Sequence, residues 1–269
     1  MNAEIGIIGG TGFYHFFTGA QDIDVETPYG IPSASVSIAT VDGRSVAFIP
    51  RHGREHQFLP PAVPYMANLW ALRSLGVRQV IGFNTVGSLQ PDVRRGDFVF
   101  CDQFIDRTNG RADSIFTGSD GAHISTAHPY CPSMRDAATK AVGVLPQRFH
   151  HRGTVVVIQG PRFSTYAESK WYTSMGWDVI NMTQYPEVAL AREFEMCYMN
   201  LSYVTDYDVA AKEIVVDETA DAVSHALVIR EFSLNGANIE QVIKTLVGAI
   251  PATDGCSCRT ALTNARVAR

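Results

Sequence analysis

Short apolar strands and helical segments succeed one another along nearly the whole chain, and this alternation limits the possible folds more than any other property of the sequence. Strands in such alternation form a parallel or mixed sheet whose two faces are covered by helices. Strands are expected at 5–8, 34–40, 45–49, 79–83, 97–101, 154–158 and 197–205, and helices at 63–75, from 132, at 165–175, 186–195 and 220–250. The sequence therefore predicts an α/β fold: a single domain with a central mixed β-sheet flanked by helices.

Composition excludes several classes of protein. A net charge of −5 at pH 7 lacks the basic surface of a nucleic-acid-binding protein. No apolar run approaches the roughly 18 residues of a membrane span, and residues 1–4 lack the cationic start of a signal peptide. Five cysteines, an odd number, predict reduced thiols and a cytoplasmic location. The charged fraction of 18% lies below the roughly 25% of average domains, which predicts that partner subunits cover some surface.

The end of the chain differs from the rest. Residues 251–269 are polar and short of large apolar side chains, so we expect a mobile tail after a domain that spans 1–250. Cys101, Cys131 and Cys197 are scattered among apolar neighbours and are expected to be separate core thiols.

A glycine-rich turn follows the first strand. Gly10 and Gly12 start like a dinucleotide-binding fingerprint, but its third glycine would fall on His15, which disfavours a hydride-transfer enzyme. Glycines also let several backbone N–H groups converge on one anion, and Thr11 adds a hydroxyl donor. An anion site and a purely structural turn both explain this segment.

Two arginines and two histidines follow the expected strand 45–49. Loops at strand ends carry function in many α/β proteins, and the guanidinium of Arg51 beside His52 matches a phosphate group. His52 and His56 have no obvious carboxylate or cysteine to complete a metal site. An anionic ligand and a solvated basic loop remain open as explanations.

Two carboxylates stand at the end of the expected strand 197–205. Asp206 and Asp208 are two positions apart, so both side chains can point to the same side. Burial and a like charge both disfavour ionisation, which allows one carboxyl to stay protonated and act as a general acid. A turn or helix cap built on aspartate is the structural alternative.

Six motifs occur in a fixed order along the chain: GGTGFY at 9–14, RHGREH at 51–56, NTVGSL at 84–89, QGPRFS at 159–164, NMTQYPE at 181–187 and TDYD at 205–208. In this order they resemble the trimeric purine nucleoside phosphorylase family, and within it the 5′-methylthioadenosine phosphorylases. The similarity runs over about residues 4–210. It implies a homotrimer with active sites near subunit boundaries and reversible phosphorolysis of an N-glycosidic bond. No metal or organic cofactor is implied; inorganic phosphate is the co-substrate.

The resemblance also assigns roles to individual residues. Those implied to hold phosphate are Thr11, Arg51, His52, Thr85, Val86 through its backbone, and Thr183. Those implied to contact the nucleoside are Phe163, which stacks on the purine, Ser164, Met182 against the ribose, Asp206, Asp208, His123 and His225. His123 matches a position that reaches the 5′ pocket of a neighbouring subunit, and His225 stands where relatives place small apolar residues against the 5′ substituent.

The acidic pair also bears on the choice of base. In the implied chemistry Asp206 protonates the purine at N7, and Asp208 accepts from a 6-amino group or steadies Asp206. A 6-oxo purine presents an acceptor instead and suits the Asn found in relatives that use inosine and guanosine. We therefore expect adenine, with a 6-oxopurine phosphorylase and a non-catalytic nucleoside-binding protein as alternatives. Cys256 and Cys258 resemble a C-terminal Cys-x-Cys that forms a disulfide in some relatives, and are expected here to be mobile thiols.

Overall fold

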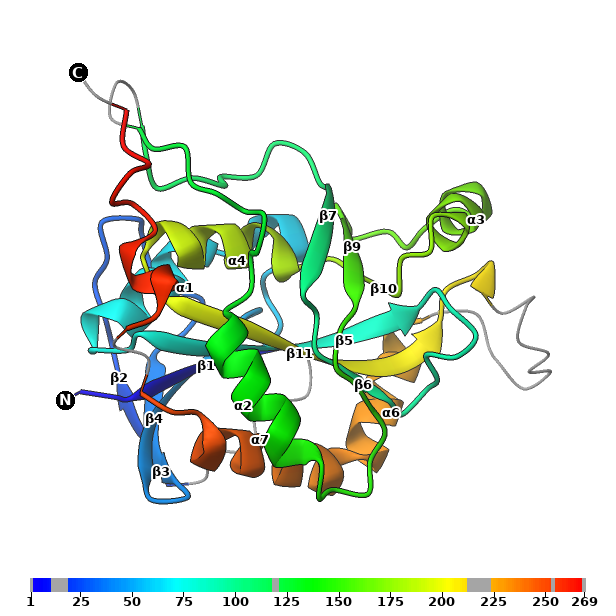
Figure 1. Ribbon diagram of the computed structural model, residues 1–269, viewed down its shortest axis with the longest axis horizontal. Helices are drawn as coiled ribbons and strands as arrows, with labels where there is room; N and C mark the ends of the chain where they lie inside the picture. Colours follow the sequence, from blue (N-terminus) through cyan, green and yellow to red (C-terminus); the bar gives the residue numbers. More distant parts are fainter. Residues whose placement is uncertain (1, 11–18, 118–120, 212–223, 253–254, 268–269) are drawn as a thin grey trace.

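Buried β-branched and aliphatic residues build the strands at the centre of the molecule. The computed structural model describes residues 2–10, 19–117, 121–211, 224–252 and 255–267, and within them eleven strands form one mixed sheet (Figure 1). The predicted α/β domain with a mixed sheet is confirmed. The strands are β1 (Ile5–Gly9), β2 (Gln21–Ile23), β3 (Val36–Val41), β4 (Arg44–Pro50), β5 (Gln79–Ser88), β6 (Phe98–Val99), β7 (Gln103–Arg107), β8 (Phe149–His150), β9 (Thr154–Ile158), β10 (Val179–Asn181) and β11 (Cys197–Tyr207).

The parallel strands β4, β1, β5 and β11 are neighbours in that order, and helices cover both faces of the sheet (Figure 1). One apolar core lies between the sheet and α2 and α7, and another lies between the sheet and α1 and α4. The helices are α1 (Tyr65–Ser74), α2 (Pro132–Val142), α3 (Tyr166–Ser174), α4 (Gln184–Glu193), α6 (His225–Leu234) and α7 (Gly236–Ala249), with short 3-10 turns η2 (Pro60–Ala62) and η3 (Ser257–Thr260). Among these helices, none combines the length and apolar composition needed to cross a bilayer.

Local signals in the sequence predicted several element ends correctly. Asp42 and Gly43 both have positive φ angles, of 49° and 77°, as a two-residue hairpin between β3 and β4 requires. Gly76 has a φ of 89° just after α1, which confirms it as the glycine that ends this helix.

Two strands are longer than predicted. β5 continues to Ser88 and β11 continues to Tyr207, because the two strands pair with each other along their whole length. Residues 84–88, expected to follow a strand, therefore belong to the strand itself. The predicted helix 220–250 is two helices, α6 and α7, with Asn235 between them, and residues 212–223 lie outside the described part.

The prediction of a mobile tail is wrong for the part of 251–269 that the structure describes. Residues 257–260 form the turn η3, and the backbone N–H of Leu262 donates to Glu195 at 3.1 Å. Farther along, the N–H of His123 donates to the carbonyl of Ala265 at 2.8 Å. The tail therefore packs across the body of the domain.

Candidate active site

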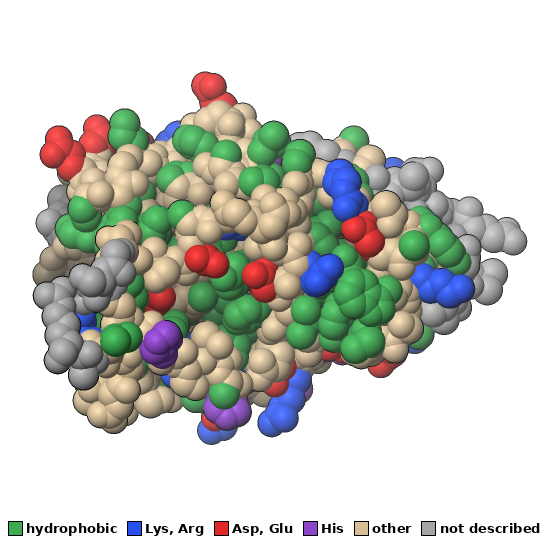
Figure 2. All heavy atoms as spheres, turned by 90° about the horizontal axis from the view of Figure 1, so that it is seen from above, with side chains coloured by type: hydrophobic (Ala, Val, Ile, Leu, Met, Phe, Trp, Pro, Cys, Tyr) green, Lys and Arg blue, Asp and Glu red, His purple; other side chains and the backbone are tan. Residues whose placement is uncertain are grey.

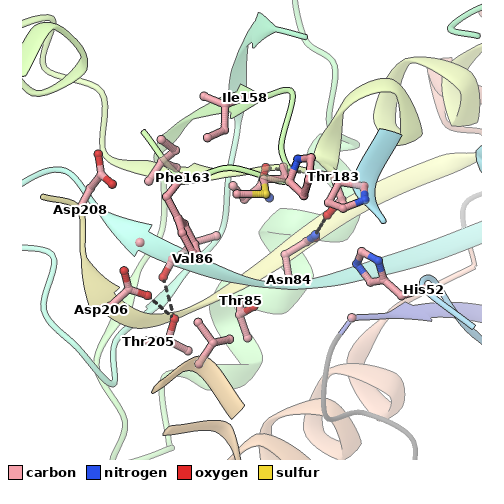
Figure 3. A pocket seen from close by; sticks show the side chains of 18 of the residues that line it. His52, Asn84, Thr85, Val86, Ile158, Phe163, Thr183, Thr205, Asp206 and Asp208 are labelled. Carbon is pink, nitrogen blue, oxygen red and sulfur yellow. Dashed lines mark hydrogen bonds between the residues drawn. The ribbon is translucent and has the colours of Figure 1, made fainter. Parts of the chain in front are cut away.

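The carboxyl ends of the four parallel strands border a cavity of about 390 Å³ (Figure 3). Ligands bind at this edge in open α/β sheets, because loops from several strands converge there. Ten of the residues that sequence reasoning assigned to phosphate or nucleoside line this one cavity: Arg51, His52, Thr85, Val86, Phe163, Ser164, Met182, Thr183, Asp206 and Asp208. In Figure 3 the two aspartates lie at one end, His52 and Thr183 lie at the other, and Phe163 lies between them.

The buried guanidinium of Arg51 lies at the cationic end. Glu187 of α4 accepts hydrogen bonds from its Nε at 2.7 Å and its Nη2 at 2.8 Å, while the carbonyls of Phe83 and Ile8 accept at 2.9 and 3.2 Å. Burial alone would lower the pKa of Arg51, but the charge and hydrogen bonds of Glu187, with smaller effects of Tyr198 and Tyr65, together outweigh it and raise the pKa above its ordinary value. Arg51 is therefore charged and held in one orientation.

His52 lines the same cavity with a defined ring orientation. Its Nδ1 lies 2.8 Å from the carbonyl oxygen of Phe58, and because a carbonyl only accepts, Nδ1 carries the proton. The ring of His56 stacks on that of His52 with centroids 4.5 Å apart. The other ring nitrogen of His52, Nε2, accepts a hydrogen bond when the ring is neutral and donates one when the ring is protonated.

A chain of buried hydrogen bonds fixes the hydroxyl of Thr183. Asn200 Nδ2 donates to the carbonyl of Gly82 at 3.0 Å, which sets the orientation of this amide, and to Asn84 Oδ1 at 2.6 Å. Ser202 donates to Asn200 Oδ1 at 2.7 Å, and Asn84 Nδ2 donates to Thr183 Oγ1 at 2.7 Å. Since Thr183 Oγ1 accepts from Asn84, its own proton is available to an acceptor in the cavity.

A β-bulge positions the acidic end. The register between β11 and β5 shifts after Val204, so that Thr205 is the extra residue and Asp206 lies opposite Gly87. Thr205 donates to Asp206 Oδ1 at 2.7 Å. A Cβ atom at Gly87 would lie 3.2 Å from Asp206 Oδ2, so the glycine gives this carboxyl its room.

Asp208 completes the acidic end. Burial raises the pKa of Asp208 above its ordinary value, against the opposing effect of nearby hydroxyl and backbone donors. Within the described residues its Oδ2 has no hydrogen-bond partner. A buried polar atom of this kind is normally paired, and because Asp208 lines the cavity, this oxygen is available to a ligand there.

The apolar wall is held in place by an arginine that the sequence did not single out. Arg111 donates to the carbonyls of Gln159 at 2.8 Å, Met182 at 2.9 Å and Tyr185 at 2.5 Å. Gly160 has a φ of 63°, and a Cβ atom there would lie 2.6 Å from the sulfur of Met182. Arg111 thus joins the segment that leads to Phe163 to the segment that carries Met182.

Three predicted site residues are not among those that line the cavity. Thr11 lies outside the described residues, and of His225 only the backbone is described, as the first residue of α6. His123 is exposed on the segment that pairs with the tail. Its predicted contact with a neighbouring subunit stays a prediction.

Sequence reasoning missed other residues of the site. Asn84 lines the cavity, although it stands in the motif NTVGSL without an assigned role. Glu187 stands in a recognised motif, but its pairing with Arg51 spans 136 positions and has no local signal. Val228 of α6 also lines the cavity.

The fold and the cavity define an α/β protein with one site at the carboxyl ends of its parallel strands, which has cationic and hydroxyl side chains at one end and two carboxyl groups at the other. The family model described as "Phosphorylase superfamily" matches residues 4–248, and the chain belongs to this family. The chain is 48% identical over 254 residues to the S-methyl-5′-thioadenosine phosphorylase of Mycolicibacterium smegmatis, covering 94% of this chain and 93% of the relative. It is 46% identical over 272 residues to the purine nucleoside phosphorylase of Streptomyces coelicolor, covering 97% and 95%. A structure of methylthioadenosine phosphorylase from Schistosoma mansoni with adenine has a TM-score of 0.89 at 31% identity, covering 98% and 99%.

Proposed function

We propose that this chain cleaves 5′-methylthioadenosine, or a related 5′-modified adenosine, with inorganic phosphate, and releases adenine and the 5-modified ribose 1-phosphate. The observation that carries the proposal is the polarity of the cavity: two carboxyl groups face fixed cationic and hydroxyl donors across an aromatic side chain. The names of the Mycolicibacterium and Schistosoma relatives support the same substrate class.

The residue types suit the chemistry. An oxygen of phosphate bonds to C1′ while the C1′–N9 bond breaks and its electron pair moves to the purine. Arg51, His52 and Thr183 hold phosphate below C1′, which makes the step effectively unimolecular and is worth up to about 7–11 kcal/mol in favourable cases. The bound anion also stabilises the positive charge that develops on the sugar.

The leaving purine takes a proton at N7 from Asp206, which enters the cycle protonated. Asp208 accepts from the 6-amino group of adenine. The resemblance assigns the remaining phosphate contacts to Thr85, the backbone of Val86 and Thr11, and the sugar side to Met182 and His225. Ser164 lies near Asp208, at the end of the cavity proposed for the base. The reaction needs no metal or organic cofactor in this scheme, because charge is moved by phosphate and carboxyl groups alone.

A second candidate is a phosphorylase for inosine or guanosine. The raised pKa of Asp208 favours its protonated form, which donates to a 6-oxo group where a carboxylate would repel it. The name of the Streptomyces coelicolor relative does not specify the base and leaves this candidate open.

A homotrimer is part of the proposal. Phe163 lines the cavity yet is 41% exposed, and Tyr166, Trp171 and Met175 on or beside α3 are 44%, 44% and 54% exposed. Figure 2 shows hydrophobic side chains gathered at the end of the molecule that carries α3. A neighbouring subunit on this face would cover Phe163 and bring its own His123 to the 5′ pocket. Light scattering that gives three times the chain mass tests this assembly.

The proposed place of the reaction is the cytoplasm, in the salvage of purines and methionine. The odd number of cysteines, five, supports a reducing compartment.

A substrate panel tests the function. The purified chain is incubated with phosphate and methylthioadenosine, adenosine, inosine or guanosine, and products are separated by chromatography. Adenine release, fastest from methylthioadenosine and dependent on phosphate, is expected. Hypoxanthine without adenine would select the second candidate, and binding without turnover would select a non-catalytic nucleoside-binding protein.

A further inference from the structure

Four of the five cysteines come together away from the cavity. The sulfur atoms of Cys131, Cys197, Cys256 and Cys258 all lie within 4.8 Å of one another, and those of Cys131 and Cys256 are 3.5 Å apart. None of the four is among the residues that line the cavity. Cys131 and Cys197 are core thiols as predicted, but they are not scattered, and the prediction that Cys256 and Cys258 are mobile is wrong.

Three separate parts of the fold supply these sulfurs. Cys131 is the residue just before α2, and Cys197 is the first residue of β11. Backbone hydrogen bonds fix both: Cys131 N–H donates to Tyr198 at 2.7 Å, and Cys197 N–H donates to Arg78 at 2.8 Å. The remaining two flank the start of η3 in the C-terminal segment. The ligand set therefore joins the tail to two rigid elements of the core.

The spacing of the sulfurs suits one tetrahedral ion. Sulfurs bound about 2.3 Å from a tetrahedral Zn²⁺ lie about 3.8 Å from one another. Because all four sulfur atoms here lie within 4.8 Å of one another, small shifts of the side chains would bring them to that separation. If the four cysteines formed two disulfides instead, the two sulfurs of each disulfide would lie about 2.05 Å apart, and the four sulfurs would no longer be evenly spaced.

The surroundings offset the charge of such a centre. Four thiolates around one divalent cation carry a net charge of −2. The N-terminus of α2, an eleven-residue helix, contributes positive partial charge at Cys131. Arg192 Nη1 lies 4.0 Å from the sulfur of Cys258.

We propose that Cys131, Cys197, Cys256 and Cys258 bind one thiophilic divalent cation of the Zn²⁺ type, which fastens the C-terminal segment to the start of β11 and of α2. Each bound ion displaces the thiol protons to solvent, four when all four cysteines start as thiols, with no change in oxidation state. Four protein ligands close the coordination sphere, so the ion is structural and takes no part in turnover.

The experiment uses the full chain, reduced, freed of metal with a chelator and desalted without oxygen. After incubation with Zn²⁺ and a second desalting step, elemental analysis is expected to give one ion per chain. Co²⁺ in its place is expected to give the strong visible absorption of a tetrahedral thiolate complex. Removing one ligand, in Cys256→Ser or Cys258→Ser, is expected to lower the Zn²⁺ affinity about tenfold or more. Both positions lie in the tail, where Cys258 is buried in the apolar core and Cys256 packs against it, and serine keeps nearly the size of the cysteine side chain.

Cys101→Ser is the matched control. Cys101 is buried like Cys258 but lies beside Ser202 and Gln184, so this variant should still bind one ion. The proposal is overturned if the reduced chain binds no Zn²⁺, or if both tail variants bind it as tightly as the parent chain. It is also overturned if thiol titration of the unreduced, unfolded chain finds only one free thiol, since the cluster would then be two disulfides.

Discussion

Asp206 is the residue on which the proposed chemistry depends most. A general acid that protonates the leaving purine acts in the transition state, whereas phosphate binds at the opposite end of the cavity. We expect Asp206→Asn to lower kcat by about 10²–10⁴-fold and to leave the KM for phosphate nearly unchanged. Steady-state kinetics with methylthioadenosine measures both constants.

The control for this variant is Asp136→Asn, which makes the same substitution at an exposed position of α2. It should have the kinetics of the parent chain. A kcat near the parent value in Asp206→Asn would mean that another group supplies the proton.

Asn84 acts through Thr183 and is a positioning residue in the proposed site. In Asn84→Asp the carboxylate accepts the Thr183 proton that otherwise points into the cavity, and its charge repels phosphate. We expect the KM for phosphate to rise about tenfold or more, with a smaller change in the KM for the nucleoside. Asn238→Asp adds the same charge on the exposed side of α7 and should change neither constant. An unchanged KM for phosphate in Asn84→Asp would show that Thr183 does not contact the anion.

At the scale of elements, the sequence predicted those features that depend on local chemistry. β1 and β9 are apolar runs, and the β3–β4 turn has the Asp-Gly pair that its backbone needs. The ends of β5 and β11 were missed because each strand is extended by pairing with the other, more than a hundred positions away. The same extension places Asn84 in the site, which explains why its role was missed.

The start of α3 is a capping box that predicts a dependence of stability on pH. Thr165 Oγ1 accepts from Glu168 N–H at 3.2 Å, and Glu168 Oε2 accepts from Thr165 N–H at 2.7 Å. The hydrogen bonds from Arg162 and then from the Thr165 backbone lower the pKa of Glu168 to about 2. A carboxyl with a lowered pKa stabilises the folded state above its unfolded pKa and loses this effect as the pH falls towards its folded pKa.

We therefore expect Glu168→Gln to lower the free energy of unfolding by about 0.5–1 kcal/mol at pH 7, since the ion pair is largely exposed. The difference should shrink as the pH falls below about 4.5. Urea unfolding at pH 7 and at pH 3.5 measures it. Glu240→Gln, which breaks the exposed pair with Lys244 on α7, is the comparison and should cost about 0.3–0.5 kcal/mol. An equal loss at both pH values for Glu168→Gln would mean that its charge is not the cause.

For the molecule as a whole, the motif order in the sequence sufficed for the fold and for most of the cavity. The sequence did not predict contacts between segments that are far apart along the chain, because neither segment has a local pattern that points to the other. Arg111 across the cavity wall, the tail on the body of the domain and the meeting of four cysteines are of this kind. Burial and pairing of such groups follow from the assembled fold and not from any one segment.

The Arg51–Glu187 pair joins more of the fold than any other contact of the site. Arg51 follows β4 and bonds to carbonyls of β1 and β5, while Glu187 lies on α4 and accepts from Tyr198 of β11 at 2.7 Å. Removing one charge of a buried pair leaves the other without compensation, which typically costs about 3–5 kcal/mol. We expect Glu187→Gln to lower the free energy of unfolding by about this amount, measured by urea unfolding with far-UV circular dichroism.

Glu4→Gln is the control for Glu187→Gln. It removes the same charge, but from an ion pair at the surface instead of a buried one. Glu4 pairs with Arg44 at 3.0 Å, but its side chain is 55% exposed, and solvent screens such a pair so that it contributes little to stability. The larger loss should therefore appear only in Glu187→Gln, together with weaker phosphate binding, because Arg51 loses the group that orients it. Equal, small losses in both variants would mean that the backbone carbonyls alone hold Arg51, and that the helix α4 is not coupled to the anion end of the site.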